Sequence, residues 1–339
     1  MIEKLYLYLG IGNDPYHNLA VEETLLHQVK PGECILYLWQ NAHTVVIGRN
    51  QNALAECDAA LLEREGGRLA RRLSGGGAVY HDLGNLNFTF LVRADDFDKS
   101  RQTEVILRAV NDAGIPADRN GRNDLTCEGR KFSGHAYYQT KEGCYHHGTL
   151  MLDVDTDRLT RYLRVSPIKL SKRGVPSVRS RVMNLSEKRP DLTVEELSSY
   201  LIHAAETVYG CKADRLYSDD LDGDYLKEAD RRYADPTWRY GDAVELPHCV
   251  VHRFDSGLLR LDYELKHTGS GATFRQVILS TDALETDLYS GFAELLTGCP
   301  LRDAQLAIRR EGEISGRQHA AQEVLELLKE IKGGTQDEL

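Results

Sequence analysis

Hydrophobic and polar residues alternate with a period of two in the stretch NLNFTFLV. Leu86, Phe88 and Phe90 are separated by Asn87 and Thr89, which is typical of a β-strand with one buried face. Short runs rich in β-branched and aromatic residues predict three further strands, at 34–40, 44–49 and 147–154. The first half of the chain is therefore expected to build a sheet.

Helices are marked by their capping residues. Asp14 followed by Pro15 predicts a helix through YHNLAVEETLLHQV, because Asp caps a helix and Pro suits its first turn. Thr193 and Glu196 fit a capping box that opens a helix ending near Gly210. Helical spacing predicts three more helices, at 103–114, 284–298 and 319–331.

The pattern loosens between residues 214 and 247, where charges and aromatics mix without clear periodicity. Beyond this stretch, the runs 257–265 and 273–280 again predict strands. We expect two domains, residues 1–245 and 246–339, a large α+β domain followed by a small one.

Composition narrows the functional classes. The chain has 339 residues and a net charge of −10, which argues against a general binder of nucleic acid or anionic membranes. It has no apolar run of about 18 residues for a membrane span and no apolar leader near its first residue. Seven cysteines without a CxxC pair make a disulfide framework or zinc cluster improbable. We expect a cytoplasmic protein without nucleic-acid or membrane partners.

The stretch RRLSGGGAVYHD, residues 71–82, has the residues of a phosphate site. Glycines let backbone N–H groups approach phosphate oxygens, and the arginines supply charge. The stretch lacks the GxxxxGK(S/T) spacing of a P-loop. It also lacks the GxGxxG turn that opens a helix in dinucleotide-binding folds, because its glycines lead into a strand. A nucleotide bound by a β-turn-β element is one interpretation. A glycine-rich hairpin turn beside surface arginines is the other.

Two later stretches add chemistry. In GRNDLTCEGRKFSGHAYY, Lys131 could neutralise a carboxylate and a phosphate together, and Asp124 could hold Mg²⁺; a solvated surface lysine is the alternative. His146 and His147 are adjacent on a predicted strand and point to opposite faces, so they cannot readily chelate one metal. We expect one of them to be packed and the other exposed.

In this order, the three stretches resemble the lipoate–protein ligase A family. The resemblance runs densely over residues 14–185, including DPYHNLAVEE and PSVRSRVMNL, and continues weakly through PTWRYGD. It implies a large catalytic domain like that of biotin and lipoyl ligases, with a mixed β-sheet flanked by helices. A small α+β accessory domain would follow.

The resemblance also implies an activity. Members activate lipoate with ATP and Mg²⁺ to lipoyl-AMP, release pyrophosphate, and transfer the lipoyl group to a lysine. The acceptors are lipoyl domains of 2-oxoacid dehydrogenases and the glycine-cleavage H protein, and the role is lipoate salvage. ATP is a co-substrate, no prosthetic group is tightly bound, and a monomer is expected.

Site residues follow from the same resemblance. Lys131 would be the catalytic group, bridging the lipoate carboxylate and the α-phosphate. The ATP and adenylate site would use Lys131 with Arg72, Gly77, Ala78, Val79, Tyr80, Asn123 and Asp124, the last also a Mg²⁺ ligand. The lipoate site would use Lys131 with Glu22, Trp39, Ser74, His81, Tyr145 and His147. Simple core packing is the alternative for Trp39.

Two departures from the family and three alternatives stay open. The segment TCEGRK is short, and Tyr138 stands where some relatives have arginine; both could change how the adenylate is covered.

An octanoyl or lipoyl transferase would use a cysteine thioester without ATP, at Cys127 or Cys144. A non-catalytic binder of lipoyl domains is also possible, whereas a biotin ligase would need a GRGRxG-type loop that is missing.

Overall fold

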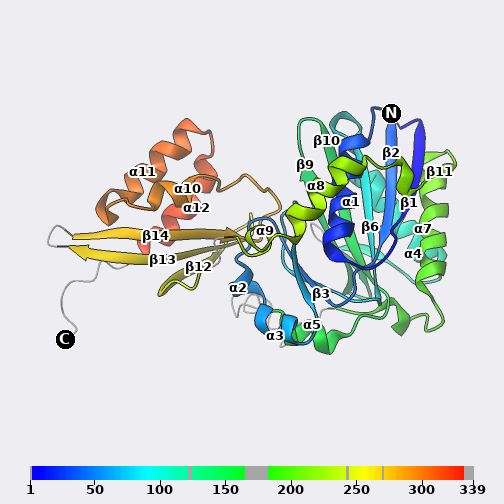
Figure 1. The fold of residues 1–339 in the computed structure, drawn as a ribbon, viewed down its shortest axis with the longest axis horizontal. Helices are drawn as coiled ribbons and strands as arrows, with labels where there is room; N and C mark the ends of the chain where they lie inside the picture. The colour runs from blue at the N-terminus through cyan, green and yellow to red at the C-terminus, as the bar shows by residue number, and fades with distance from the viewer. Residues whose placement is uncertain (1, 121–123, 165–181, 242–243, 269–270, 332–339) are drawn as a thin grey trace.

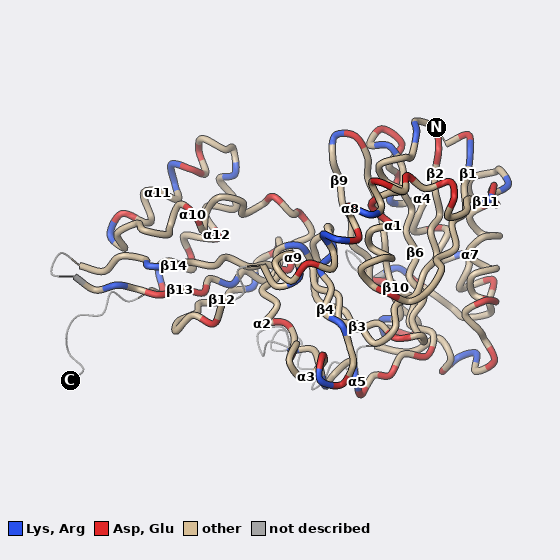
Figure 2. Tube along the Cα trace, viewed as in Figure 1, with Lys and Arg blue, Asp and Glu red and all other residues tan. Residues whose placement is uncertain are grey.

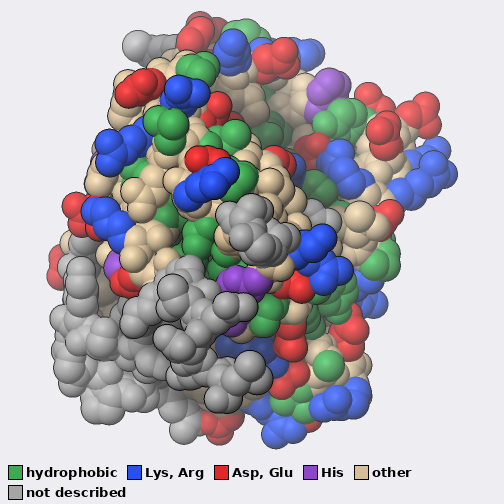
Figure 3. Space-filling model, turned by 90° about the vertical axis from the view of Figure 1, so that its left-hand side faces the viewer, with side chains coloured by type: hydrophobic (Ala, Val, Ile, Leu, Met, Phe, Trp, Pro, Cys, Tyr) green, Lys and Arg blue, Asp and Glu red, His purple; other side chains and the backbone are tan. Residues whose placement is uncertain are grey.

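The computed structural model describes all residues except 1, 121–123, 165–181, 242–243, 269–270 and 332–339. A larger unit and a smaller unit follow each other along the long axis of the molecule (Figure 1). Basic and acidic residues are distributed along both units (Figure 2). In Figure 3, basic and acidic side chains are interspersed over the described part of the visible face. No helix in the described ranges is long and apolar enough to cross a membrane.

The larger unit is built on a mixed eight-stranded sheet. Its strands, in spatial order, are β11 (Ala213–Leu216), β1 (Lys4–Leu9), β2 (Glu33–Trp39), β6 (Asn85–Arg93), β10 (Gly143–Met151), β9 (Arg130–Gln139), β8 (Asp124–Cys127) and β7 (Asp118–Asn120). β1 runs parallel to both β11 and β2, whereas the pairs from β2 to β7 are antiparallel. With helices on both faces, this architecture confirms the predicted α+β fold.

Two pairs of helices cover the two faces of this sheet (Figure 1). α4 (Lys99–Asp112) and α7 (Val194–Tyr209) pack against one face through apolar residues such as Ile106 and Leu201. α1 (Pro15–Gln28) and α8 (Gly223–Ala234) cover the other face, where Leu25 and Tyr233 join its core. The Asp14 and Thr193 side chains cap α1 and α7, as predicted.

The strand predicted with one buried face is buried on both. All residues of β6 except the last are buried, because β6 lies between β2 and β10 with helices over each face. The half-exposed prediction was therefore wrong. Asn87 and Thr89 do not face solvent; they lie inside the molecule, at 2% and 0% exposure.

A second, three-stranded sheet carries the glycine stretch. Its order is β4 (Arg68–Arg71), β3 (Thr44–Ile47) and β5 (Val79–His81). β4 and β5 each pair with β3, so the glycines cross the end of β3 and do not close a hairpin. Gly48 makes this crossing possible, because a Cβ at Gly48 would lie 2.2 Å from the Gly76 carbonyl oxygen.

The smaller unit has a core of its own, which includes Leu261, Phe274 and Val324. Its antiparallel sheet consists of β12 (His248–Arg253), β13 (Leu258–Thr268) and β14 (Gly271–Thr281). The helices are α10 (Phe292–Leu296), α11 (Leu301–Ile314) and α12 (Gln318–Lys329). The predicted helix at 284–298 is helical only over α10, and α11 was not predicted.

Short elements complete the larger unit. They are α2 (Ala53–Glu56), α3 (Ala59–Arg64), η1 (Ala94–Asp96), α5 (Thr156–Tyr162), η3 (Leu185–Glu187), η4 (Ser218–Asp220) and α9 (Pro236–Tyr240). α8 and α9 lie within the stretch 214–247, which the sequence left without periodicity. The boundary at 245/246 falls between α9 and β12 and stays a prediction.

Candidate functional site

A chain of buried polar side chains connects α1 with the glycine stretch. Glu22 Oε1 accepts a hydrogen bond from Thr89 Oγ1 (2.7 Å) and lies 2.9 Å from His147 Nδ1. The other ring nitrogen of His147, Nε2, lies 2.7 Å from Ser74 Oγ, which accepts from Arg72 Nε (3.0 Å). All five side chains are buried. Buried polar groups normally have such partners, because an unpaired one is costly.

Three aromatic side chains surround this chain of hydrogen bonds. Trp39 Nε1 donates to Thr89 Oγ1 (3.1 Å), and the Tyr145 ring lies 4.8 Å from the His147 ring. His81 meets the Trp39 ring edge-on, with centroids 6.3 Å apart. The structure thus brings Glu22, Ser74, His147 and these aromatics into one buried cluster. That they bind lipoate stays a prediction.

Strand register explains how residues distant in sequence meet here. His147 of β10 pairs with Thr89 of β6, so both side chains leave the sheet on the face covered by α1. His146 points to the opposite face, where its ring nitrogens contact His135 and Gln102. The two histidines face apart, as predicted. Both are buried, so the expectation that one is exposed was wrong.

His81 is a neutral hydrogen-bond donor whose ring N–H has no acceptor in the part of the chain that the structure describes. Burial, and next the charge of Arg72, lower its pKa to about 3. The amide Nδ2 of Asn41 lies 3.1 Å from His81 Nδ1; since an amide nitrogen only donates, Nδ1 accepts and the proton is on Nε2. Nε2 is buried and has no partner among the described residues, so its donor capacity is unused.

Arg72 holds the glycine loop in place. Its Nη1 donates to the Val46 carbonyl (3.1 Å), and its Nη2 donates to the carbonyls of Gly75 (2.7 Å) and Gly77 (2.8 Å). Burial lowers its pKa to about 10, so it remains charged at neutral pH. Here its donors serve the loop, and direct contact with phosphate stays a prediction.

The rest of the predicted adenylate-binding stretch follows this loop. A Cβ at Gly77 would meet no atom within 4 Å, so there is open space beside this residue. Ala78 is half-buried, and Val79 and Tyr80 belong to β5. The Tyr80 ring is buried and packs against Tyr162. Their backbone groups are therefore positioned by the sheet, and their contact with nucleotide stays a prediction.

The smaller unit covers the glycine loop. The Gly76 N–H donates to the carbonyl oxygen of Ala283 (3.1 Å). A Cβ at Gly75 would lie 2.2 Å from that same oxygen. The segment after β14 therefore contacts the backbone of the glycine loop directly. Its Ala283 carbonyl accepts from the Gly76 N–H, a donor that a phosphate oxygen could otherwise use.

Lys131 lies near the start of β9 and pairs with Asp124 of β8, with Nζ 2.8 Å from Oδ1. Its side chain is 37% exposed, so it is neither fully solvated nor enclosed. The residue three positions on is a glycine, and a Cβ at Gly134 would lie 2.8 Å from Lys131 Nζ. The missing side chain leaves room for the ammonium group over the strand.

Of the predicted nucleotide residue Asn123 and the predicted Mg²⁺ ligand Asp124, only the second is described. Asn123 lies outside the described residues. Asp124 offers one carboxylate, and the described residues contain no group of three or more His, Cys, Asp or Glu suited to a metal. A single carboxylate nevertheless fits Mg²⁺ bound to a nucleotide, because that ion takes most of its ligands from water and phosphate.

Sequence reasoning missed Arg71 as a structural residue. Its guanidinium donates to six backbone carbonyls, those of Gly48, Arg49, Gln51, Trp238, Arg239 and Tyr240. Arg72 contacts the glycine loop, whereas Arg71 fixes α9 to the loop after β3. The adjacent arginines looked like one basic pair, although neighbours in extended chain point to opposite sides.

Comparison with known proteins agrees with this architecture. Residues 14–206 match the model of the lipoyl protein ligase A/B catalytic domain family. Plasmodium falciparum LipL1 in complex with lipoate is 26% identical, with 94% of this chain and 99% of that chain covered and a TM-score of 0.76.

Two further solved structures resemble the larger part of the chain. A bipartite lipoate protein ligase from Thermoplasma acidophilum, described with its E2 lipoyl domain, is 27% identical (72% of this chain, 98% of that chain, TM-score 0.63). A lipoate–protein ligase A bound with ATP is 26% identical (72% and 100%, TM-score 0.61). Because the family model spans more than half of the sequence, the chain belongs to the lipoyl protein ligase A/B catalytic domain family.

Proposed function

We propose that this protein is an ATP-dependent lipoate–protein ligase. It activates lipoate to lipoyl-AMP with release of pyrophosphate and transfers the lipoyl group to a lysine of lipoyl domains and of glycine-cleavage H protein. One observation carries the proposal: Ser74 Oγ links Arg72 of the glycine loop to His147 and Glu22 of the buried cluster. A nucleotide site and an acyl site joined in this way suit a reaction between the two ligands.

The first half-reaction needs two anions brought together. A lipoate carboxylate oxygen attacks the α-phosphorus, the bond to the β-phosphate breaks, and pyrophosphate leaves. The Lys131 ammonium stabilises the charge that develops on both partners. The His81 Nε2–H, which has no acceptor among the described residues, supplies a further donor for a ligand oxygen. When bound, Mg²⁺ neutralises triphosphate charge, and Asp124 is the carboxylate that would hold it.

The second half-reaction needs no nucleophile from this chain. The acceptor lysine attacks the carbonyl carbon of lipoyl-AMP, and AMP leaves. Support for these ligands comes from the relatives, which include a structure with lipoate, a structure with ATP, and a ligase described together with its E2 lipoyl domain. From the family resemblance we also propose that the protein acts as a monomer and salvages free lipoate.

The cysteines give little support to a thioester route. Cys127 and Cys144 are buried, at 0% and 3% exposure, and burial raises the pKa of both thiols. An attacking thiol needs the opposite, a lowered pKa and access to its substrate. The ATP-dependent route therefore remains the better account of this site.

Mass spectrometry of an apo lipoyl domain tests the proposal. Incubated with ATP, Mg²⁺, lipoate and this protein, the domain should gain one lipoyl group. Lys131→Ala should reduce the rate on the order of 10²- to 10³-fold, while a Cys127→Ser/Cys144→Ser double variant keeps it. Modification that survives Lys131→Ala but is lost with the cysteines would overturn the proposal in favour of transfer.

A further inference from the structure

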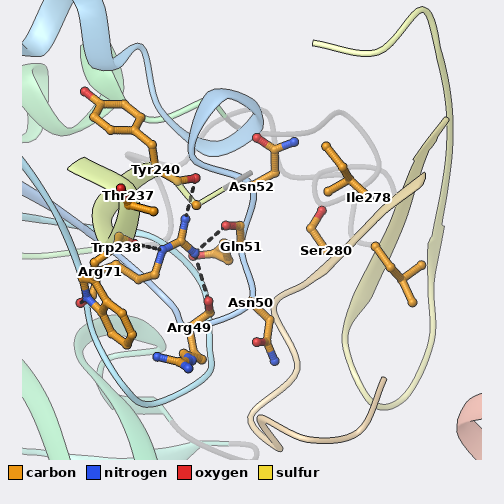
Figure 4. Close-up of a pocket in the computed structure, with 12 residues that line it drawn as sticks. Arg49, Asn50, Gln51, Asn52, Arg71, Thr237, Trp238, Tyr240, Ile278 and Ser280 are labelled. Carbon is orange, nitrogen blue, oxygen red and sulfur yellow. Dashed lines mark hydrogen bonds between the residues drawn. The ribbon is translucent and has the colours of Figure 1, made fainter. Parts of the chain in front are cut away.

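A pocket with a cavity volume of about 290 Å³ opens between the two units. Figure 4 shows its two walls, with Arg71 among the residues of the larger unit and Ile278 and Ser280 of β14 across from it. It is lined by Arg49, Asn50, Gln51, Asn52, Arg71, Thr237, Trp238, Tyr240, Gly241, Ile278, Leu279 and Ser280. The Thr281 N–H donates to the Asn50 carbonyl (3.0 Å) beside it, so this pocket exists only where the units meet.

The wall formed by the larger unit carries positive charge without an opposing carboxylate. Among the described residues, Arg71 donates only to backbone carbonyls, and burial, with Arg49 as the second cause, lowers its pKa to about 10. It therefore stays charged at neutral pH. None of the described lining residues is acidic, so no carboxylate among them offsets the charge of Arg71 and Arg49.

Further donors line the same wall. The guanidinium carbon of Arg49 lies over the Trp238 ring, 4.2 Å from its centroid, a cation–π contact that holds a charged group rich in N–H donors at the pocket. Gln51 is 3% exposed and its Oε1 accepts from the Gly48 N–H (2.8 Å). Its Nε2 has no partner among the described residues. A buried amide donor without an acceptor is a group that a ligand oxygen would satisfy.

We propose that this pocket binds a small phosphate-class anion, inorganic phosphate or pyrophosphate, at a site separate from the acyl-adenylate site. The charge of two arginines and an unpaired amide donor in one pocket lining suit an oxyanion with several acceptor oxygens. The site is separate because Arg72, next in the chain, turns the other way, toward the glycine loop and Ser74. An anion bound between the walls ties the smaller unit to the larger one.

The pocket has a built-in optical reporter. The protein has two tryptophans, Trp39 in the buried cluster and Trp238 in this pocket, so Trp39→Phe leaves Trp238 as the only indole. Sodium pyrophosphate and, separately, sodium phosphate are titrated into this protein at constant ionic strength, without ATP, Mg²⁺ or lipoate. We expect a saturable change in Trp238 fluorescence, with calorimetry on the same protein giving the same affinity.

Variants locate the site. Arg49→Gln should weaken binding by about tenfold or more, because it removes a charge-assisted donor. Gln51→Glu should abolish it, because the new carboxylate still accepts from the Gly48 N–H but repels an anion. The matched control is Arg302→Gln on α11, which removes the same charge from a side chain that is 74% exposed; its affinity should equal that of the parent.

The arms of the experiment also separate the sources of the anion. Tighter binding of pyrophosphate than of phosphate identifies the reaction product as ligand, a conclusion that rests on the proposed function; equal binding identifies free phosphate. No saturable change up to ~10 mM, equal binding of citrate, or unchanged affinity in Arg49→Gln and Gln51→Glu overturns the proposal. So does loss of binding in Lys131→Ala, because the anion would then occupy the acyl-adenylate site. None of these results depends on catalysis.

Discussion

Replacing Gly134 with alanine should move the Lys131 ammonium while leaving the fold intact. The new Cβ would lie 2.8 Å from Lys131 Nζ and 3.0 Å from its Cε, whereas ordinary contact begins at 3.4 Å. The ammonium must therefore shift by at least about 0.6 Å, and a misplacement near 1 Å can cost about 100-fold in rate. We expect lipoate adenylation to fall about 10- to 100-fold, toward the level of Lys131→Ala.

Stability should hardly change in the same variant. The displaced group is the end of a flexible side chain, and its partly exposed ion pair with Asp124 contributes no more than about 1 kcal/mol. Gly223→Ala is the control, because a Cβ there meets no atom within 4 Å. ATP–pyrophosphate exchange and urea unfolding are measured on both variants. Full activity in Gly134→Ala, or a loss of more than about 2 kcal/mol of stability, would refute the reasoning.

Three other predictions concern the loop, the buried cluster and pH. Gly75→Ala would place a Cβ 2.2 Å from the Ala283 carbonyl oxygen, so the smaller unit must move away; X-ray scattering should show a larger radius of gyration, and an unchanged curve would count against this. Glu22→Leu leaves the Thr89 hydroxyl and His147 Nδ1 without their acceptor and should cost about 2–5 kcal/mol in urea unfolding. Glu22→Gln keeps an acceptor and should cost less than half as much; equal losses would contradict the network. Burial lowers the pKa of His81 on β5 and of His135 on β9 to about 3. The unfolded chain binds their protons near pH 6.5 and the folded chain does not, so stability is full above that pH and falls as the pH drops. From pH 6 to 5 these two histidines should cost roughly 2 kcal/mol, and His146, whose pKa burial also lowers, adds to the loss; a flat profile would disprove it.

Local signals in the sequence predicted the elements that depend on local chemistry. Asp14 and Thr193 cap their helices as expected, because capping needs only a few neighbouring residues. The predictions that failed concern features that depend on contacts between residues far apart in the sequence. β6 reads as half-exposed, yet it is covered on both faces, and its polar residue Thr89 serves the buried cluster. Alternating apolar and polar residues show that the two faces of a strand differ in chemistry. They do not show whether the polar face is exposed to solvent or buried in a polar interior.

The candidate site shows the same division. Family resemblance named Ser74, His147 and Glu22, and the structure brings them into one chain of hydrogen bonds. The resemblance did not indicate that Arg71 positions α9. Its partners are six backbone carbonyls from two segments, and carbonyl groups leave no pattern of side chains in the sequence. The contact of Gly76 with the smaller unit was equally invisible, since it depends on how the two units meet.

The central claim is that this protein forms an acyl-adenylate from lipoate and ATP. Its most direct test is ATP–pyrophosphate exchange with purified protein and Mg²⁺, with and without lipoate. We expect exchange that requires lipoate and is lost in Lys131→Ala, a result that can be read without knowing the acceptor. Absence of exchange in the folded protein, together with acyl transfer from an acyl-protein donor, would contradict it and direct mutagenesis to Cys127 and Cys144.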